Sequence, residues 1–85
     1  MTFFTYLLEC RDGTLYCGWT TDLDARLAEH QSGRGARYTR SRLPVRLVYS
    51  EELATASDAR RRELAIKKLH RRAKLLLIAT AHTYR

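Results

Sequence analysis

Five side chains in this sequence are of types that can act on an anionic ligand, and their spacing would let them meet. Tyr6 and Tyr16 lie ten residues apart, in two apolar runs separated by a turn. Arg26 and His30 lie four residues apart, which places both on one face of a helix. An arginine can bind an oxyanion through its fork of N–H donors, and a histidine can transfer a proton near neutral pH. A carboxylate such as that of Glu63 can hold a divalent cation.

Each of these residues also has a purely structural interpretation. The two tyrosines could be half-buried strand aromatics, and the arginine could be a solvated helix residue. His30 could be a surface imidazole near a helix C-terminus, where a cation is favoured. Glu63 could simply pair with Lys67 four residues later, a contact worth roughly half a kcal/mol or less. Taken singly, no residue decides between the two interpretations.

The N-terminal part of the chain is predicted to be a β-hairpin. Two runs rich in Phe, Tyr, Leu, Thr and Trp flank a turn that contains Gly13. A two-residue loop would place Tyr6 opposite Trp19. A three-residue loop with a left-handed Gly13 would place Tyr6 opposite Gly18, with Tyr16 on the same face. We favour the second register because Gly18 leaves space beside Tyr6, although the sequence does not force it. Trp19 is expected to pack under the following helix.

A helix is predicted directly after the hairpin. Thr21 and Asp24 have the spacing of a capping box. Leu23 and Leu27 form an apolar stripe, beside which the arginine and the histidine lie. Gly33 is expected to end the helix in a left-handed conformation.

Residues 34–42 are predicted to form a basic loop, which Gly35 keeps mobile. So many donors in a short segment suit contacts with phosphates, while an ordinary solvated loop is the alternative. The side chains that we expect to bind nucleic acid are Arg34, Arg37, Tyr38, Arg40 and Arg42, together with Lys67.

A third strand is predicted to begin at Pro44 and to end at Glu51-Glu52. Val45, Leu47 and Tyr49 alternate with other residues and are therefore expected to share one buried face.

Two helices are predicted in the C-terminal part. The first is capped by Thr55 or Ser57 and extends to Leu69. The second begins at about Ala73, and the tail 80–85 is expected to fray.

The composition is that of one small basic domain. The chain has 85 residues, a net charge of +7 and a pI of about 10, which indicates an anionic partner such as nucleic acid. Cys10 and Cys17 fall on opposite faces of the favoured hairpin, so they are not expected to pair. No Cys/His spacing resembles a zinc site. The apolar start is too short for a membrane span and has no export signal, so we expect a cytoplasmic protein with no membrane partner.

Several motifs follow one another at characteristic intervals. They are Phe4-Thr5-Tyr6, Tyr16-Cys17-Gly18, Arg26 within residues 22–27, His30, and Glu63 within residues 61–69. Together they resemble the GIY-YIG nuclease superfamily, whose fold is shared by excision-repair nucleases, some homing and restriction enzymes and junction-resolving nucleases. The runs 35–40 and 45–49 look like the small stand-alone branch of unassigned function. The chain departs from the family in one respect: it contains no asparagine, which the family often has near its site.

The resemblance implies an α+β fold. We expect a small three-stranded antiparallel sheet flanked by about three helices in the order β-β-α-β-α-α. Residues 1–85 would form a single domain, with a core over about residues 4–79.

The resemblance also implies hydrolysis of DNA phosphodiester bonds, with selection of structure rather than sequence. Arg26 would clamp the scissile phosphate, and Glu63 would hold one Mg²⁺ or Mn²⁺ ion. Tyr6 or Tyr16 would accept the proton of the attacking water. His30 would orient a tyrosine or the water, or would transfer a proton. The alternative is a module that binds nucleic acid on the same basic face without cutting it. A partner protein for substrate choice is a further expectation, and a pure protein-interaction domain has little support beyond small size.

Overall fold

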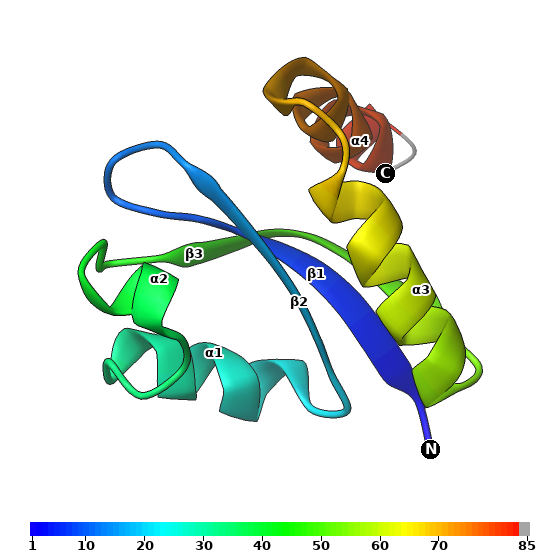
Figure 1. The fold of residues 1–85 in the computed structure, drawn as a ribbon, viewed down its shortest axis with the longest axis horizontal. Helices are drawn as coiled ribbons and strands as arrows, with labels where there is room; N and C mark the ends of the chain where they lie inside the picture. The colour runs from blue at the N-terminus through cyan, green and yellow to red at the C-terminus, as the bar shows by residue number, and fades with distance from the viewer. Residues whose placement is uncertain (84–85) are drawn as a thin grey trace.

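A three-stranded sheet with helices on both sides forms the molecule (Figure 1). The computed structural model describes residues 1–83. The elements are β1 (Phe3–Glu9), β2 (Leu15–Thr20), α1 (Leu23–Gln31), α2 (Arg37–Arg40), β3 (Arg46–Leu53), α3 (Ala56–Lys67) and α4 (Arg71–Thr83). The expected α+β fold and element order are therefore confirmed, with the one-turn helix α2 as an addition. No helix within residues 1–83 has the length and apolar character that a membrane span requires.

The hairpin has the favoured register. The sheet order is β2-β1-β3, and Tyr6 lies opposite Gly18 in the antiparallel pair of β1 and β2. The Cys10 N–H donates to the Thr14 carbonyl at 2.8 Å, and Gly13 has a φ of 84°. A three-residue loop with a left-handed glycine therefore connects the strands, as predicted.

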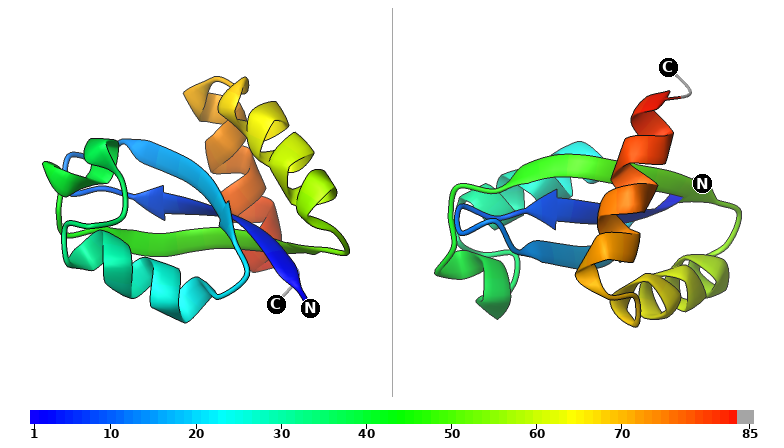
Figure 2. Two further views of the ribbon diagram at one scale, coloured as in Figure 1. Left: turned by 60° about the horizontal axis from the view of Figure 1, so that its bottom comes forward. Right: turned by 90° about the horizontal axis from the view of Figure 1, so that it is seen from above.

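Helices cover both faces of the sheet (Figure 2), and each face carries a separate core. The core on the α1 side contains Tyr6, Leu8, Cys10 and Val45, against which Tyr16, Leu23, Leu27 and Leu43 pack. The core on the side of α3 and α4 contains Leu7, Cys17 and Ile66, against which Val48, Tyr49, Leu77 and Ile78 pack. Both cysteines are free and lie in different cores, as expected. The sheet thus holds Tyr6 and Tyr16 toward α1 and Cys17 toward α3.

The third strand differs from the prediction at both ends and in its register. It begins at Arg46 rather than at Pro44, and it continues to Leu53, beyond the predicted end at Glu51-Glu52. Leu47 is exposed, so its predicted burial was wrong. The Glu51 carboxylate accepts a hydrogen bond from Arg62 of α3 at 2.7 Å. The register also shifts, because Leu7 pairs with Tyr49 whereas Leu8 pairs with Leu47. Such an irregularity reverses the alternation of side chains. Tyr49 therefore packs on the α3–α4 side, and its expected place on the same face as Val45 was wrong.

The caps of the helices differ in part from the predicted ones. Asp22, not Thr21, caps α1, because its carboxylate accepts the Ala25 N–H at 3.0 Å. Thr55, one of the two candidates, caps α3 by accepting the Asp58 N–H at 3.0 Å. Gly33 is left-handed after α1, as predicted.

Two further expectations for packing and helix length were wrong. The last helix begins at Arg71 and extends to Thr83, so the predicted fraying from residue 80 does not hold as far as residue 83. Residues 84 and 85 of that predicted tail lie outside the described residues. Trp19 pairs with Thr5, whose hydroxyl donates to the Ala59 carbonyl of α3. Trp19 therefore faces the α3 side, against Phe3, rather than lying under α1.

Candidate active site

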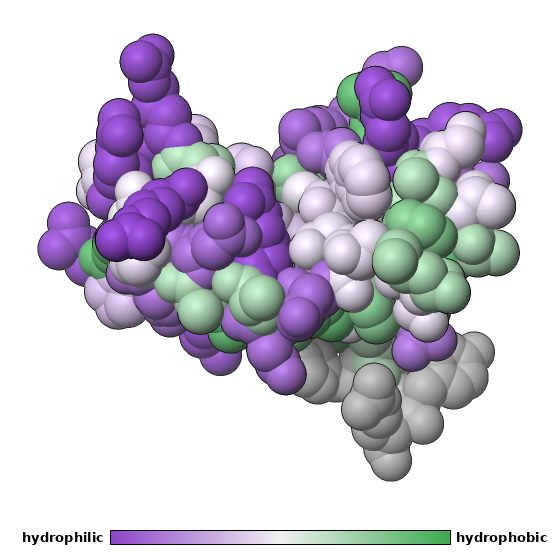
Figure 3. Space-filling view, turned by 90° about the horizontal axis from the view of Figure 1, so that it is seen from below, coloured by the Kyte–Doolittle hydropathy of each residue, from purple (hydrophilic) through white to green (hydrophobic). Residues whose placement is uncertain are grey.

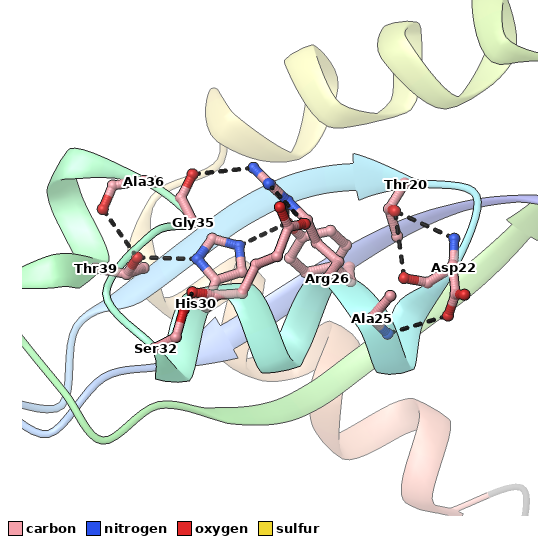
Figure 4. A network of polar contacts seen from close by, with 11 residues as sticks. Thr20, Asp22, Ala25, Arg26, His30, Ser32, Gly35, Ala36 and Thr39 are labelled. Atoms are coloured by element: carbon pink, nitrogen blue, oxygen red, sulfur yellow. Dashed lines mark hydrogen bonds and ion pairs between the residues drawn. The ribbon is translucent and has the colours of Figure 1, made fainter.

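The hydroxyl of Tyr6 is the centre of the candidate site. Tyr6 lies in the middle strand and is only 2% exposed. Its hydroxyl lies 2.9 Å from Nε2 of His30 and accepts a hydrogen bond from Nε of Arg26 at 3.4 Å. Figure 4 shows Arg26 and His30 extending from the same side of α1. The four-residue spacing in the sequence therefore brings both side chains to one hydroxyl.

Gly18 makes room for the Tyr6 ring. A Cβ atom at Gly18 would lie 2.6 Å from the Tyr6 hydroxyl oxygen and 2.8 Å from its Cζ. The space that the sequence predicted beside Tyr6 exists, and the tyrosine ring itself fills it. The hairpin register thus decides whether the hydroxyl can reach α1.

His30 is fully buried beneath the segment that contains α2. Its Nδ1 lies 2.9 Å from the hydroxyl of Thr39. A Cβ atom at Gly35 would lie 2.3 Å from that Nδ1 and 2.8 Å from the His30 Cα. The Gly35 carbonyl also accepts a hydrogen bond from Arg26 at 3.2 Å. Gly35 was expected to keep this segment mobile, but what it provides is close packing against His30.

Tyr16 packs against the His30 ring in a T-shaped arrangement. The two ring centroids are 5.3 Å apart with an interplanar angle of 64°. Tyr16 also stacks on Tyr38 at 6.0 Å and 23°. Beside it is an open hollow of about 220 Å³. The residues that line this hollow are Leu15, Tyr16, Cys17, Tyr38, Lys67 and Lys74.

Glu63 stands outside this network. It lies on α3, on the other side of the sheet from α1, with its side chain 17% exposed. Its carboxylate forms an ion pair with Lys67 at 2.9 Å, which is the structural alternative recognised in the sequence. Lys67 lines the same hollow as Tyr16, so the ion pair with Lys67 places the Glu63 carboxylate near that hollow.

A single divalent cation with mostly water ligands fits this arrangement. The side chains that the structure describes include no group of three or more His, Cys, Asp or Glu that could enclose a metal. Mg²⁺ keeps several waters and is often held by one or two carboxylates together with substrate phosphates. Only one oxygen of Glu63 is engaged by Lys67. The donor set therefore suits an ion completed by water and phosphate, and does not suit a closed protein cage.

The basic segment is more ordered than the predicted loop, since it contains α2. Arg34, Arg37 and Arg40 are exposed around this turn. Much of the surface on the α1–α2 side is hydrophilic (Figure 3).

Arg42 has a different environment from these three arginines. It donates to Asp12 of the hairpin at 3.1 Å and to the Tyr38 carbonyl at 2.8 Å. Its guanidinium also lies 3.9 Å from the centroid of the Tyr38 ring. Arg42 thus ties α2 to the hairpin.

Burial sets the protonation states at the centre of the site. It raises the pKa of Tyr6 to about 12, and the hydrogen bond from Arg26 offsets part of this rise. Burial, followed by the charge of Arg26, lowers the pKa of His30 below its ordinary value of 6.5. At neutral pH, Tyr6 is therefore protonated and His30 is neutral.

Acidification is expected to destabilise the protein through His30. Because the pKa of His30 is lower in the folded protein than the ordinary 6.5, the unfolded chain binds the proton first. Stability is thus fully present above pH 6.5 and falls as the pH drops toward the folded pKa. The slope for one proton is at most about 1.4 kcal/mol per pH unit. Urea unfolding at several pH values measures this slope.

The matched control for this prediction is the exposed His70. His30→Gln should flatten the pH dependence of the unfolding free energy, whereas His70→Gln should leave it unchanged. An unaltered slope in His30→Gln would assign the effect to other groups.

A family comparison agrees with these observations. The model of the GIY-YIG catalytic domain matches residues 2–76. The chain belongs to the GIY-YIG family. The matched range includes both tyrosine motifs, the α1 residues and Glu63, and the predicted resemblance is therefore confirmed.

Several proteins similar to this chain are named as UPF0213 proteins. YsiG of Lactococcus lactis subsp. lactis is 54% identical over 77 residues, covering 89% of this chain and 74% of the relative. A UPF0213 protein of Streptococcus agalactiae serotype V is 52% identical over 75 residues, covering 88% and 85%. The solution NMR structure of a Bacillus halodurans UPF0213 protein is 45% identical with a TM-score of 0.61, covering 94% of this chain and 85% of that one.

Sequence reasoning missed Thr39 and the packing role of Gly35. Thr39 is fully buried between arginine-rich neighbours, where the charge pattern indicated exposure. The available signal was the pair itself, because a glycine and a small hydroxyl residue closely follow the predicted end of the histidine-bearing helix.

Proposed function

We propose that this domain is an endonuclease that hydrolyses DNA phosphodiester bonds with one Mg²⁺ or Mn²⁺ ion. The observation that carries the proposal is the convergence of Arg26, His30 and Tyr16 around the buried hydroxyl of Tyr6. Membership of the GIY-YIG family supports the same reaction class, since the matching domain is described as catalytic. The basic surface beside the site suits a polyanionic substrate.

Arg26 is the proposed phosphate clamp. Its guanidinium contacts Tyr6, Glu29 and the Gly35 carbonyl, each through a different nitrogen. These contacts fix the plane of the guanidinium and leave further N–H donors for a phosphate oxygen. Preorganised donors of this kind stabilise the charge that develops on a phosphate during attack.

Tyr16 is the proposed general base. The buried Tyr6 has a pKa of about 12 and is poorly suited to lose its proton at neutral pH. Tyr16 lines the hollow, where a water and a phosphate can enter, together with Lys67 and Lys74. His30 contacts both tyrosines and orients them.

Glu63 is the proposed metal ligand. Lys67 would exchange its ion pair with Glu63 for a contact with a DNA phosphate, which frees the carboxylate. A divalent ion bound there would neutralise charge on the phosphate and its leaving oxygen. Water would then attack the phosphorus in line with the leaving oxygen, so that the P–O bond to that oxygen breaks and no covalent intermediate forms.

The exposed arginines around α2 are the proposed contacts to the DNA backbone. Arg34, Arg37 and Arg40 would contact phosphates, which fixes position without reading sequence. Tyr38 and Arg42 would support the same surface through their stacked contact. Selectivity would therefore depend on DNA shape, with a partner protein as a further source of substrate choice. The two free cysteines suit the reducing cytoplasm.

A second candidate function is DNA binding without cleavage. It is favoured by the Glu63–Lys67 ion pair, which occupies the proposed metal ligand.

A cleavage assay separates the two functions. Branched, nicked, flapped and linear DNA are incubated with the protein in Mg²⁺, in Mn²⁺ and in EDTA. The nuclease proposal predicts cutting that requires the metal and that favours branched or flapped DNA. If nothing is cut under any condition, and gel shifts weaken steeply with salt, the domain is a binding module.

A further inference from the structure

We propose that Thr39 is a positioning residue that fixes the tautomer of His30, with the proton on Nδ1 and a lone pair on Nε2. Through this tautomer, Thr39 also sets the direction of the hydrogen bond between Tyr6 and His30. The catalytic consequence rests on the proposed function, whereas the tautomer itself does not.

The contacts form one continuous series of hydrogen bonds, which starts on α1, passes through Tyr6 of the sheet and ends at α2. Arg26 Nε donates to the Tyr6 hydroxyl at 3.4 Å, and that hydroxyl lies 2.9 Å from His30 Nε2. On the other side of the ring, His30 Nδ1 lies 2.9 Å from the Thr39 hydroxyl. That hydroxyl donates to the Ala36 carbonyl at 3.2 Å. Figure 4 shows the His30 ring between these two sets of contacts.

Thr39 sets the direction of donation in this series of hydrogen bonds. A carbonyl can only accept, so the single hydroxyl proton of Thr39 points to Ala36. The Thr39 oxygen is then available to accept, and the only proton that it can accept is one on Nδ1 of His30. A neutral imidazole with a proton on Nδ1 has a bare Nε2, which must be an acceptor.

The Tyr6 end requires the same direction. The Ala36 carbonyl also accepts the Arg40 N–H, and with its two lone pairs it can accept the Thr39 hydroxyl as well. Tyr6 is 2% exposed and already accepts a hydrogen bond from Arg26. If Nε2 carried the proton, Tyr6 would accept twice and its own proton would be buried without an acceptor. Only the tautomer with the proton on Nδ1 gives a partner to every polar hydrogen in this series of hydrogen bonds.

The positioning role has a consequence for Tyr6. With the Nδ1 tautomer, the Tyr6 proton is directed at His30 and the Tyr6 oxygen at Arg26. This arrangement holds the guanidinium against the sheet and keeps the His30 ring edge-on to Tyr16. Because Thr39 lies on α2, the basic segment and the proposed base are linked through one imidazole ring.

Nitrogen-detected NMR of His30 tests the tautomer directly. In the wild-type protein, Nδ1 should carry the proton and Nε2 should give the signal of a bare nitrogen. Thr39→Ser keeps the hydroxyl and should preserve this pattern. Thr39→Val keeps the shape but offers no acceptor, and should move His30 toward the Nε2-protonated form. A wild-type protein with the proton on Nε2, or a folded Thr39→Val with an unchanged pattern, would overturn the proposal.

Cleavage kinetics test the consequence. Thr39→Val should lower the cutting rate about tenfold or more with DNA affinity unchanged, and Thr39→Ser should restore it. Thr80→Val removes an exposed hydroxyl from α4 and should change neither readout. If the wild-type protein does not cut DNA, the proposed function fails while the NMR test still decides the tautomer. If Thr39→Val cuts at the wild-type rate although its tautomer has changed, the positioning role is excluded.

Discussion

Replacing Glu63 with glutamine is expected to reduce metal-dependent cutting by about 100-fold or more while DNA binding persists. Glutamine has nearly the same shape as glutamate, so the packing of this largely buried side chain on α3 should survive. It has no charge to hold a divalent cation and loses the ion pair with Lys67. The freed lysine remains beside the hollow and can still contact a phosphate. Affinity should therefore stay the same or rise slightly.

The measurement is single-turnover cleavage across a Mg²⁺ titration, with gel shifts in EDTA for binding. Asp58→Asn is the matched control, because it removes another short-range ion pair of α3, that with Arg61, at the other end of the helix. The stability of Asp58→Asn should change by only about 0.5 kcal/mol, the scale of an exposed helical ion pair, and that of Glu63→Gln, whose pair is partly exposed, by up to about 1 kcal/mol. If Glu63→Gln cuts at the wild-type rate and EDTA still inhibits it, the metal is held elsewhere.

Local patterns in the sequence predicted the part of the site that depends on short spacings. The hairpin register followed from Gly13 and from the space at Gly18, and both are local features of the two strands. The four-residue spacing of Arg26 and His30 required only a helix to bring them to one hydroxyl. These predictions succeeded because strand and helix periodicities fix the direction of neighbouring side chains.

Contacts between distant segments were not predictable in the same way. The shift in β3 depends on pairing with β1, and nothing in the alternation of Val45, Leu47 and Tyr49 indicates where a register breaks. The predictions for Thr39 and Gly35 rested on the composition of their segment. Composition indicates how solvated a segment is, but not which side chain the segment covers.

Glu63 illustrates a third limit, because the two interpretations of the sequence are not exclusive. A glutamate four residues before a lysine predicts an ion pair, and the structure has one. The same glutamate matches the GIY-YIG pattern, and its partner Lys67 lines the hollow beside Tyr16. A lysine that holds the carboxylate without DNA and releases it to a phosphate would satisfy both patterns. The glutamine variant described above distinguishes this from a purely structural pair.

Gly35→Ala is expected to be the most damaging change that adds only a methyl group. The new Cβ would lie 2.3 Å from Nδ1 and 2.6 Å from Cγ of His30, and 2.8 Å from its Cα. The last of these atoms is backbone, so rotation of the imidazole cannot relieve the overlap. Either α1 or the segment before α2 must move, which breaks the Arg26 contact to the Gly35 carbonyl. We expect a loss of about 1–3 kcal/mol in unfolding free energy. Displacement of His30 and Arg26 should also lower cutting by about 100-fold.

Gly33→Ala provides the control, because it lies two residues away and is expected to strain the backbone without a steric overlap with His30. Its φ is 85°, so alanine strains the backbone there, but the nearest atom to a new Cβ is the Arg40 Cγ at 3.8 Å. Gly33→Ala should therefore cost about 1 kcal/mol of stability and leave the His30 NMR signals in place. Gly35→Ala should shift those signals and weaken binding of the site to a phosphate, in addition to its effect on stability. If Gly35→Ala matched Gly33→Ala in both respects, the close contact between this segment and His30 would not exist in solution. Such a result would also remove the route by which Thr39 reaches the imidazole, because the same close approach brings both residues to it.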